Sequence, residues 1–422
     1  MDVSLTGPAA RRRILSVMHS VFAVPLLYPP TIDIGFRPIP LAWLLGISGL
    51  LFATFVAGSR LRIERDLFIG QITISALIVM VLFGGYAAGG LSVDIFAQLI
   101  LGSGILFFSI YVLGPLVYRG QDPVGRVFAI FVGATTIHSL LVILVFLAPE
   151  VRLAFHPVIY LDSETIERLG SGFRSAGLSA TAGEAMSVGK GIAMYLLVRS
   201  YLTRRVDMFR LLVFGTIILG AMILLNRTGL VIGVVGVVVA LLSGKVLKVR
   251  PMVILTGVAA IVLLAVVMVS HIPRSELPTA VNRTLEPLDA LVQTGKLASR
   301  STDALLGTML IFPDDNWIQG DGNYGRQDEL GFVQSDIGYI RMLFGGGLIC
   351  VAAWIVLVSS LALAYARGAE VRYFAKFLAI VWLLANVKIL WVLPLEAPTI
   401  ALGLLLYMKH QELKFTSGNP VG

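Results

Sequence analysis

The sequence is poor in charged residues and in cysteine. Only 14% of its 422 residues are charged, while 57% are hydrophobic and the mean hydropathy is +0.88. Soluble domains carry about a quarter charged residues, so this composition excludes an ordinary soluble fold. The one cysteine, Cys350, lies inside an apolar block, which excludes a disulfide framework.

Patterns that bind metals or nucleotides are missing as well. No histidines or cysteines have the spacing of a zinc site, and the carboxylate doublet Asp314-Asp315 is too small to predict a metal. The run from Gly320 to Gly325 matches G-x-G-x-x-G, but no strand precedes it and no helix opens at once, so a dinucleotide site is rejected. We therefore expect no cofactor.

Apolar residues are present in excess, and they are gathered in blocks such as 211–225, 230–242 and 252–270. Only helices and closed barrels satisfy their backbone in lipid, and these blocks lack the alternation of barrel strands. With about 20 residues per crossing, we expect an all-α polytopic membrane protein of about 12 transmembrane helices, in one domain over 1–422. The expected spans are 14–28, 39–58, 67–87, 93–117, 127–148, 186–203, 210–226, 228–243, 251–271, 336–366, 373–393 and 398–408.

The charges support this layout. The chain holds 33 lysines and arginines against 25 acidic residues, for a formal net charge of +8. With the N-terminus inside, most basic residues fall in cytoplasmic loops and most acidic residues fall outside, as the positive-inside rule requires. We expect a bacterial inner-membrane protein with both termini in the cytoplasm. Because the loop bias accounts for the basic charge, no nucleic-acid partner is expected.

Two connections are long, 149–185 and 271–335, and both fall on the periplasmic side of this layout. Connections of this length are uncommon in compact proteins unless they have a function. Both contain aromatic residues and prolines, which favours folded loops. Any chemistry is therefore expected at the periplasmic face.

A first polar group contains Arg174 between two glycines, followed by Glu184 and Lys190. Arg174 precedes a membrane entry, where a planar guanidinium is suited to grip a phosphate. The alternatives are that Arg174 is a solvated loop residue and that Lys190 merely snorkels to the interface.

A second polar group, Asn226-Arg227-Thr228, separates two apolar blocks. An arginine in such a place is costly and needs a partner or a ligand. The alternative is topological, because one arginine can end a helix at the membrane surface. In the expected layout this tight turn reaches the outer side.

A third group joins the run 320–325, Asp336, Arg341 and the glycines 345–347. Asp336 stands at a helix entry and has the alternative role of a helix cap. Arg341 lies one to two turns further in and is harder to explain by solvation. A lone intramembrane histidine such as His138 is more often hydrogen-bonded packing than a proton relay.

The order of these motifs resembles that of a known family. An Arg-x-x-Gly before a mid-chain helix is followed by an apolar run ending in Asn-Arg-Thr-Gly, a long outer loop, Gly-x-Gly, and Ser-Asp-Ile-Gly-Tyr before a glycine-rich helix. This order is similar to that of the O-antigen polymerase and O-antigen ligase superfamily of membrane glycosyltransferases (Wzy-type and WaaL-type). The resemblance covers residues 150–350 and the overall topology.

The resemblance implies a glycosyltransferase C-like helical fold that acts on undecaprenyl-diphosphate-linked oligosaccharide at the periplasmic face without a metal. It implies that Arg174 and Arg227 hold the diphosphate and that Asp336 sits in the matching helix-entry motif. Arg341 and Lys190 are further substrate-binding candidates. Membrane lipid and a chain-length regulator protein are candidate partners.

Two departures from the family pattern bear on the reaction. The family usually writes Ser-Arg where this chain has Asn226-Arg227, and the histidine that the ligases use in the large loop is matched here only by His271 at its edge. The missing histidine favours a polymerase. A base must remove a proton from the acceptor sugar, and Glu184 is the first choice because it follows Arg174 at the membrane surface, with Asp336 and His156 as alternatives.

The expected function is therefore polymerisation of polysaccharide repeat units, with catalytic Glu184 and Asp336. A ligase that transfers finished glycan to lipid A core is the near alternative. A transporter or flippase of lipid-linked oligosaccharide is the alternative from another class. Transporters commonly show broken helices and internal repeats, and no repeat relates the halves of this sequence.

Overall fold

The computed structural model describes the chain in segments. These are 8–33, 38–58, 93–148, 150–151, 159–160, 183–243, 279, 281–282, 285–286, 290, 303–304, 307–313, 316–322, 335–363, 366, 368–388, 394 and 396–416. Two expected spans, 67–87 and 251–271, lie outside these residues, as does most of the expected loop 149–185.

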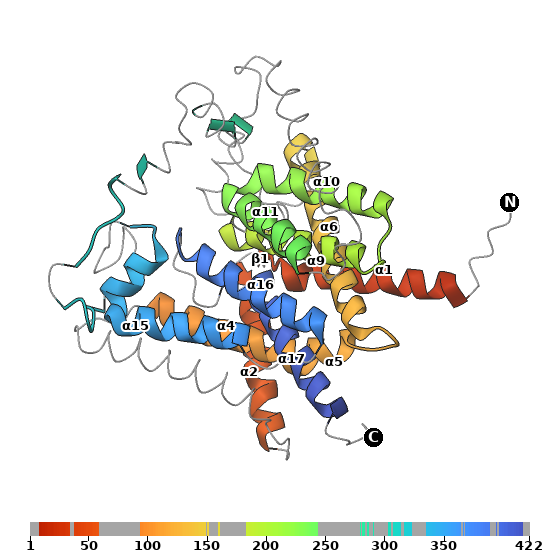
Figure 1. Ribbon diagram of the computed structural model, residues 1–422, viewed down its shortest axis with the longest axis horizontal. Coiled ribbons are helices and arrows are strands. Elements are labelled where there is room, and N and C mark those ends of the chain that lie inside the picture. Colours follow the sequence, from red (N-terminus) through yellow and green to blue (C-terminus); the bar gives the residue numbers. More distant parts are fainter. Residues whose placement is uncertain are drawn as a thin grey trace. The chain divides into compact units, whose positions relative to one another are not determined.

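The described residues are mostly helical, as the apolar blocks predicted. The helices are α1 (Pro8–Leu27), α2 (Leu41–Gly58), α4 (Val93–Phe108), the π-helix η1 (Ser109–Leu113), α5 (Gly114–Val117), α6 (Pro123–Leu147), α9 (Glu184–Leu202), α10 (Met208–Leu225), α11 (Arg227–Leu242), α15 (Gly338–Leu363), α16 (Ala369–Ala385) and α17 (Ala397–Thr416) (Figure 1). Of the remaining expected spans, 93–117 is made of α4, η1 and α5 in succession, and each of the others falls mainly on one helix. The largest boundary differences are at α16, which ends at Ala385, and at α17, which continues to Thr416.

Four stretches of helix are long and apolar enough to cross a membrane within the described part of the chain. They are Ala97–Val117, Pro123–Leu147, Met208–Leu225 and Gly338–Ser360. Shorter apolar helices cover Val17–Leu27, Leu41–Phe55 and Arg227–Leu242. The length and composition of these helices indicate a membrane-associated protein.

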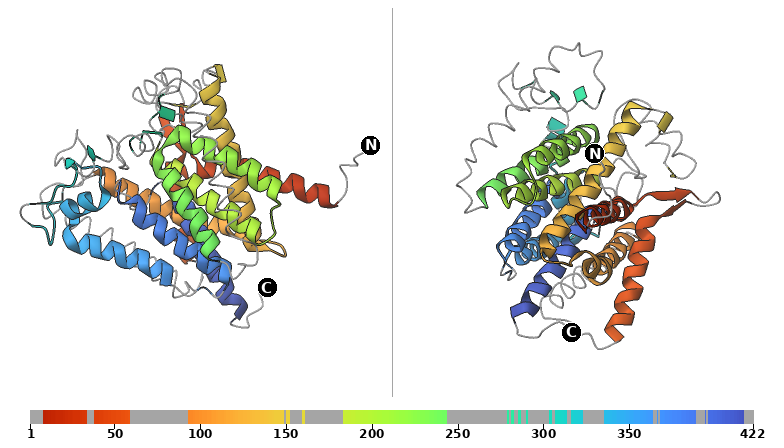
Figure 2. Two further views of the ribbon diagram at one scale, coloured as in Figure 1. Left: turned by 45° about the horizontal axis from the view of Figure 1, so that its top comes forward. Right: turned by 90° about the vertical axis from the view of Figure 1, so that its right-hand side faces the viewer.

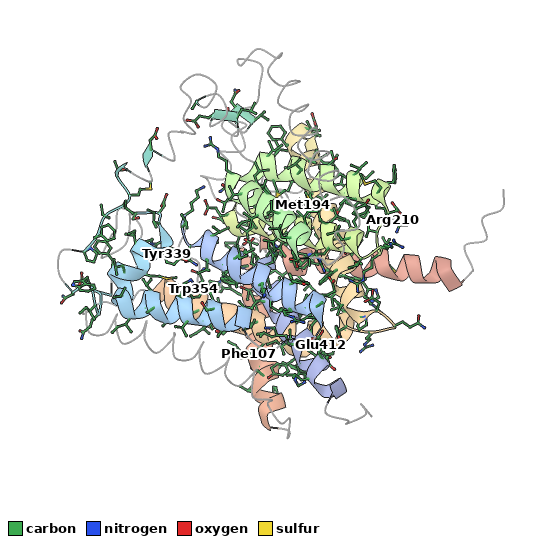
Figure 3. All side chains as sticks on the ribbon, in the orientation of Figure 1. Phe107, Met194, Arg210, Tyr339, Trp354 and Glu412 are labelled. Carbon is green, nitrogen blue, oxygen red and sulfur yellow. The ribbon has the colours of Figure 1, made fainter. Side chains whose placement is uncertain are left out.

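The chain divides into two compact units, and each is described by itself. The first unit contains residues 1–39 and 128–299, and the second contains 40–127 and 300–422. In the first unit α9 packs against both α10 and α11. Its side chains from 186 to 200 are almost all buried, and Met194, one of those only partly buried, is labelled in Figure 3. A helix that is apolar around most of its surface is typical of a central position.

Glycines let α9 and α11 approach closely. A Cβ atom at Gly229 would collide with the Oγ and carbonyl of Ser187, and one at Gly191 would press on Ile232 and Gly233. Small residues at a helix crossing are the usual means of close packing between membrane helices. The second unit uses the same device where Gly46 and Gly49 of α2 meet Gly104 of α4.

Aromatic residues join α15 to α16 in the second unit. The rings of Trp354 and Trp382 meet edge to face with centroids 5.7 Å apart. The hydroxyl of Tyr339 donates to the carbonyl of Leu383 at 2.9 Å, and its backbone N–H donates to Asn386. Tyr339 and Trp354 are labelled in Figure 3.

Two local features differ from an all-α chain of straight spans. A short two-stranded sheet pairs β1 (Thr31–Asp33) with β2 (Pro38–Pro40), visible in Figure 2, and Ile32 also bridges to Ile159. Prolines exclude helix here and β-branched residues favour an extended chain. In addition, α15 is interrupted at Gly347, which has φ +66° and ψ −169°.

Candidate functional site

The candidate site lies in the first unit, where α10 ends and α11 begins. Asn226 is both the C-cap of α10 and the N-cap of α11, with extended backbone angles of φ −162° and ψ 143°. Its side-chain oxygen accepts hydrogen bonds from the N–H of Thr228 at 3.1 Å and from the Thr228 hydroxyl at 3.3 Å. Asparagine is among the best N-cap residues because its short side chain reaches the unpaired N–H groups of the first turn.

The same asparagine holds the predicted base. Asn226 Nδ2 donates to Oε1 of Glu184 at 3.0 Å. Glu184 is the first residue of α9, where the partial positive charge of the helix N-terminus favours a carboxylate. The amide thus uses its oxygen to cap α11 and its nitrogen to orient Glu184.

Ser187 fixes the turn to α9 from the other side. Its hydroxyl donates to the backbone carbonyl of Asn226 at 3.0 Å, and Gly229 lies directly against it. Asn226 is 7% exposed. The position of the turn relative to the start of α9 is therefore set by hydrogen bonds to both the side chain and the backbone of Asn226.

Arg227 begins α11 and is bound to a carboxylate. Its Nη2 atom lies 2.7 Å from Oε2 of Glu286, and the two side chains are 23% and 31% exposed. A cation at a helix N-terminus is opposed by the helix dipole, so this position calls for an anion beside it. Glu286 belongs to the expected periplasmic loop 271–335, and it supplies that anion in the structure.

A second polar cluster lies further along α9. Lys190 Nζ is 2.8 Å from Nδ1 of His138 on α6 and 4.4 Å from the centre of the Tyr28 ring. The rings of Tyr28 and His138 stack with centroids 4.1 Å apart, and the Tyr28 hydroxyl bonds to Thr135 at 3.0 Å. Lys190, His138 and Tyr28 are all 0% exposed. Lys190 therefore does not snorkel to an interface, and His138 is paired within a buried polar cluster.

Both the buried cluster and the Asn226 turn contact α9, but they contact it at different positions along the helix. Glu184, Ser187 and Lys190 follow one another at intervals of three residues along α9, and Lys190 is about 9 Å along the axis from Glu184 at about 1.5 Å per residue. The structure thus brings Glu184 to the Asn226-Arg227 turn through the hydrogen bond from Asn226, a contact that the sequence did not predict. It places the Lys190 ammonium against His138.

The other predicted residues fall outside the described residues or in the second unit. Arg174 and the alternative base His156 lie outside the described residues. Asp336 and Arg341 belong to the second unit, where Asp336 is exposed and Arg341 is 6% exposed. Ahead of α15, the hydroxyl of Ser335 accepts from the N–H of Ile337 at 3.1 Å and donates to the carbonyl of Met309 at 2.7 Å, and the capping role of Asp336 stays a prediction.

Sequence reasoning missed three contributors to the site. Glu286 carried no signal beyond its charge in a long loop, and Ser187 resembled any small residue of a packed helix. The pairing of His138 with Lys190 had a signal, because two ionisable residues in apolar helices each need a partner. Among the described residues, no three metal-ligating side chains gather in one place.

Comparison with known proteins adds no identity to this geometry. No family model, no curated protein and no solved structure matches the chain. Any assignment of function therefore depends on the arrangement of Glu184, Asn226 and Arg227 and on the order of the sequence motifs.

Proposed function

We propose that the chain is a metal-independent membrane glycosyltransferase that polymerises polysaccharide repeat units. It transfers a growing glycan from undecaprenyl diphosphate to the end sugar of a lipid-linked repeat unit. In this proposal the chain crosses the bacterial inner membrane about 12 times in a glycosyltransferase C-like fold, with cytoplasmic termini and a periplasmic site.

One observation carries the proposal: the carboxylate of Glu184 is held by the residue that precedes an arginine, where the start of α9 meets the turn between α10 and α11. Asn226 holds Glu184 at 3.0 Å, and the next residue is Arg227. A general base must be held within hydrogen-bond reach of the hydroxyl that it deprotonates. A guanidinium is the preferred partner of a phosphate because it offers two parallel N–H donors. These are the two groups that transfer from a lipid diphosphate requires.

The reaction balances with these residues. Glu184 takes the proton of the acceptor hydroxyl, whose oxygen forms the new bond to the anomeric carbon of the donor. The bond between that carbon and the phosphate oxygen breaks, and the lipid diphosphate leaves with the bonding electrons. Arg227 exchanges Glu286 for the diphosphate and stabilises the charge that develops on it. Arg174 supplies the second guanidinium in this proposal.

The other predicted residues receive lesser roles. Because the ammonium of Lys190 is fully buried against His138, we assign it a contribution to the local positive potential, without direct contact with the diphosphate. Asp336 stays the alternative base, since its exposed side chain is open to a substrate. Arg341 stays a candidate ligand of the diphosphate in the second unit.

The proposal is tested with purified protein in liposomes supplied with a lipid-linked repeat unit and excess EDTA. A ladder of products that differ by one repeat is the expected result. If products appear only after magnesium is restored, the metal-independent mechanism is wrong. If no condition yields a ladder, the polymerase assignment fails.

A transporter or flippase of lipid-linked oligosaccharide is the second candidate, and one observation favours it. The apolar helix α15 is broken at Gly347, and broken helices are common at transporter binding sites. The two functions separate in the same liposomes. A flippase moves a fluorescent lipid-linked sugar across the bilayer without lengthening it, whereas the polymerase lengthens it without moving it.

A further inference from the structure

The break in α15 leaves backbone groups that the helix itself does not satisfy. Gly347 has φ +66°, and the chain changes direction there (Figure 1). The helical hydrogen bonds that would cross this residue are lost, so carbonyls before the break and N–H groups after it need other partners. In an apolar environment such groups are costly when unpaired.

Residues 316–322, which we call the strap, supply those partners. The N–H groups of Asp321 and Gly322 donate to the carbonyls of Phe344 and Gly345 at 2.6 and 3.0 Å. After the break, Leu348 and Ile349 donate to the carbonyls of Trp317 and Ile318 at 2.8 and 3.3 Å. The strap therefore pairs with two carbonyls of α15 before Gly347 and with two N–H groups after it.

The strap and the helix meet backbone to backbone, which explains the glycines of both motifs. Gly320 has φ +75°, and a Cβ added to it would lie 2.5 Å from the nitrogen of Gly347. A Cβ at Gly347 would collide with the carbonyl of Ile318. Only glycine combines a positive φ with so close an approach. Gly320 and Gly322 of the first motif and the glycines 345–347 of the second thus take part in a structural contact, and no nucleotide is needed to explain them.

This junction carries a contiguous apolar surface. The residues that exchange hydrogen bonds across it leave large side chains exposed: Trp317 is 52% exposed, Ile318 50%, Leu348 45% and Ile349 49%. Further along α15, Ile355 and Val356 are 43% and 65% exposed. Exposed apolar side chains in such a group mark a surface that contacts a membrane or another protein.

We propose that the strap lies in the membrane together with α15, with the side chains of Trp317 and Ile318 in contact with lipid at the boundary between head groups and acyl chains. The surface is continuous with the exposed face of Gly338–Ser360, a stretch apolar and long enough to cross a membrane. A non-helical segment can enter lipid only if its backbone N–H and carbonyl groups have hydrogen-bond partners. Four backbone groups of the strap have such partners on α15. Tryptophan is enriched at this boundary.

The sequence predicted that the whole of 271–335 is a periplasmic loop, whereas part of it lies in the membrane if the strap contacts lipid. Residues 316–322 become a re-entrant element within it. The inference stands on α15 and the strap, and it holds whether the protein transfers glycans or transports them.

Spin labelling tests the position of the strap. In a Cys350→Ser background, Ile318→Cys is labelled and reconstituted into phosphatidylcholine and phosphatidylglycerol vesicles, with Val356→Cys as the helix-surface control and Asp122→Cys as the polar control. We expect the label at 318 to collide with oxygen several-fold more often than with a water-soluble nickel chelate, as at 356. Dominant collision with the chelate, as at 122, would place the strap in water and overturn the proposal. Low collision with both would show that protein covers this surface, which overturns it equally.

A second measurement avoids any cysteine substitution. Brominated lipids are compared with ordinary lipids for the wild-type chain and for Trp317→Phe, because the chain has five tryptophans. The difference in fluorescence between the two proteins is the contribution of Trp317, and it should be smaller in brominated lipid than in ordinary lipid. If this difference is the same in both lipids, Trp317 does not contact lipid.

Discussion

At the scale of single residues, Asn226 decides how the site is built. Its amide both caps α11 and orients Glu184, so a substitution can remove one function and keep the other. A carboxylate accepts hydrogen bonds only. Asn226→Asp therefore keeps the cap but loses the donor to Glu184.

We expect Asn226→Asp to melt below the wild-type chain, because its carboxylate then faces that of Glu184 across a contact of 3.0 Å, and glycan transfer to fall by about 10- to 100-fold, a part of what a positioned base contributes. Thermal unfolding in detergent and the initial rate of transfer measure the two effects. Asn226→Ala removes both functions and should lower both quantities. Equal transfer by Asn226→Asp and the wild type would show that the contact with Glu184 has no role in the reaction.

Arg227 and Glu286 form an ion pair, and we expect the diphosphate of the substrate to replace Glu286 as the partner of Arg227. Arg227→Gln removes a charge-assisted contact worth about 1.5–3 kcal/mol, so KM for the lipid diphosphate should rise by about 10- to 100-fold. Glu286→Gln removes the competing anion, and KM should stay the same or fall. Steady-state kinetics of both variants test this contrast. If KM is unchanged in both and each loses stability, the pair is only structural.

A double-mutant cycle measures how strongly Lys190 and His138 interact in the buried cluster. Lys190→Met leaves the His138 ring without its donor, at a cost of about 1–3 kcal/mol. His138→Phe keeps an aromatic ring against Tyr28. In the double variant no buried partner is left unpaired, so its loss of stability should be smaller than the sum of the single losses. Additive losses would mean that the two side chains do not interact.

At the scale of helices, most of the architecture was predictable from composition. Apolar blocks predict helices because neither lipid nor a packed protein interior offers hydrogen-bond partners to the backbone. In a helix the backbone N–H and carbonyl groups bond to one another. Boundaries set by a polar residue, such as the turn at Asn226, were found closely. The break at Gly347 was not, because its cause is the strap, which lies distant in sequence and binds through backbone atoms. Residue types carry little trace of such a contact.

The crossing of α9 and α11 gives a prediction with a matched control. Gly229→Ala would drive a methyl group into Ser187, and such overpacking costs about 1–3 kcal/mol. Gly215→Ala on α10 meets only Leu197, at 3.9 Å, so the better helix propensity of alanine should stabilise it by about 0.5–1 kcal/mol. Melting temperatures of the two variants should move in opposite directions. A stable Gly229→Ala would mean that this crossing is looser than described.

At the scale of the whole molecule, the sequence and the structure contribute different parts of the account. Composition and charge bias predicted a helical membrane protein, and four long apolar helices are in keeping with that. The contact between Glu184 and Asn226 was not predicted, since the two residues are far apart along the chain. Glu286 was beyond prediction, because nothing local distinguishes it from other loop acids.

The most direct test of the account is the rate of glycan transfer by Glu184→Gln in liposomes with EDTA. Glutamine has nearly the same shape and can still accept the hydrogen bond from Asn226, but it cannot take a proton from a sugar hydroxyl. The account predicts that lipid-linked substrate binds as in the wild type while turnover falls by at least about 100-fold. Turnover within a few-fold of the wild type would contradict the assignment of Glu184 as the base and of this turn as the catalytic site.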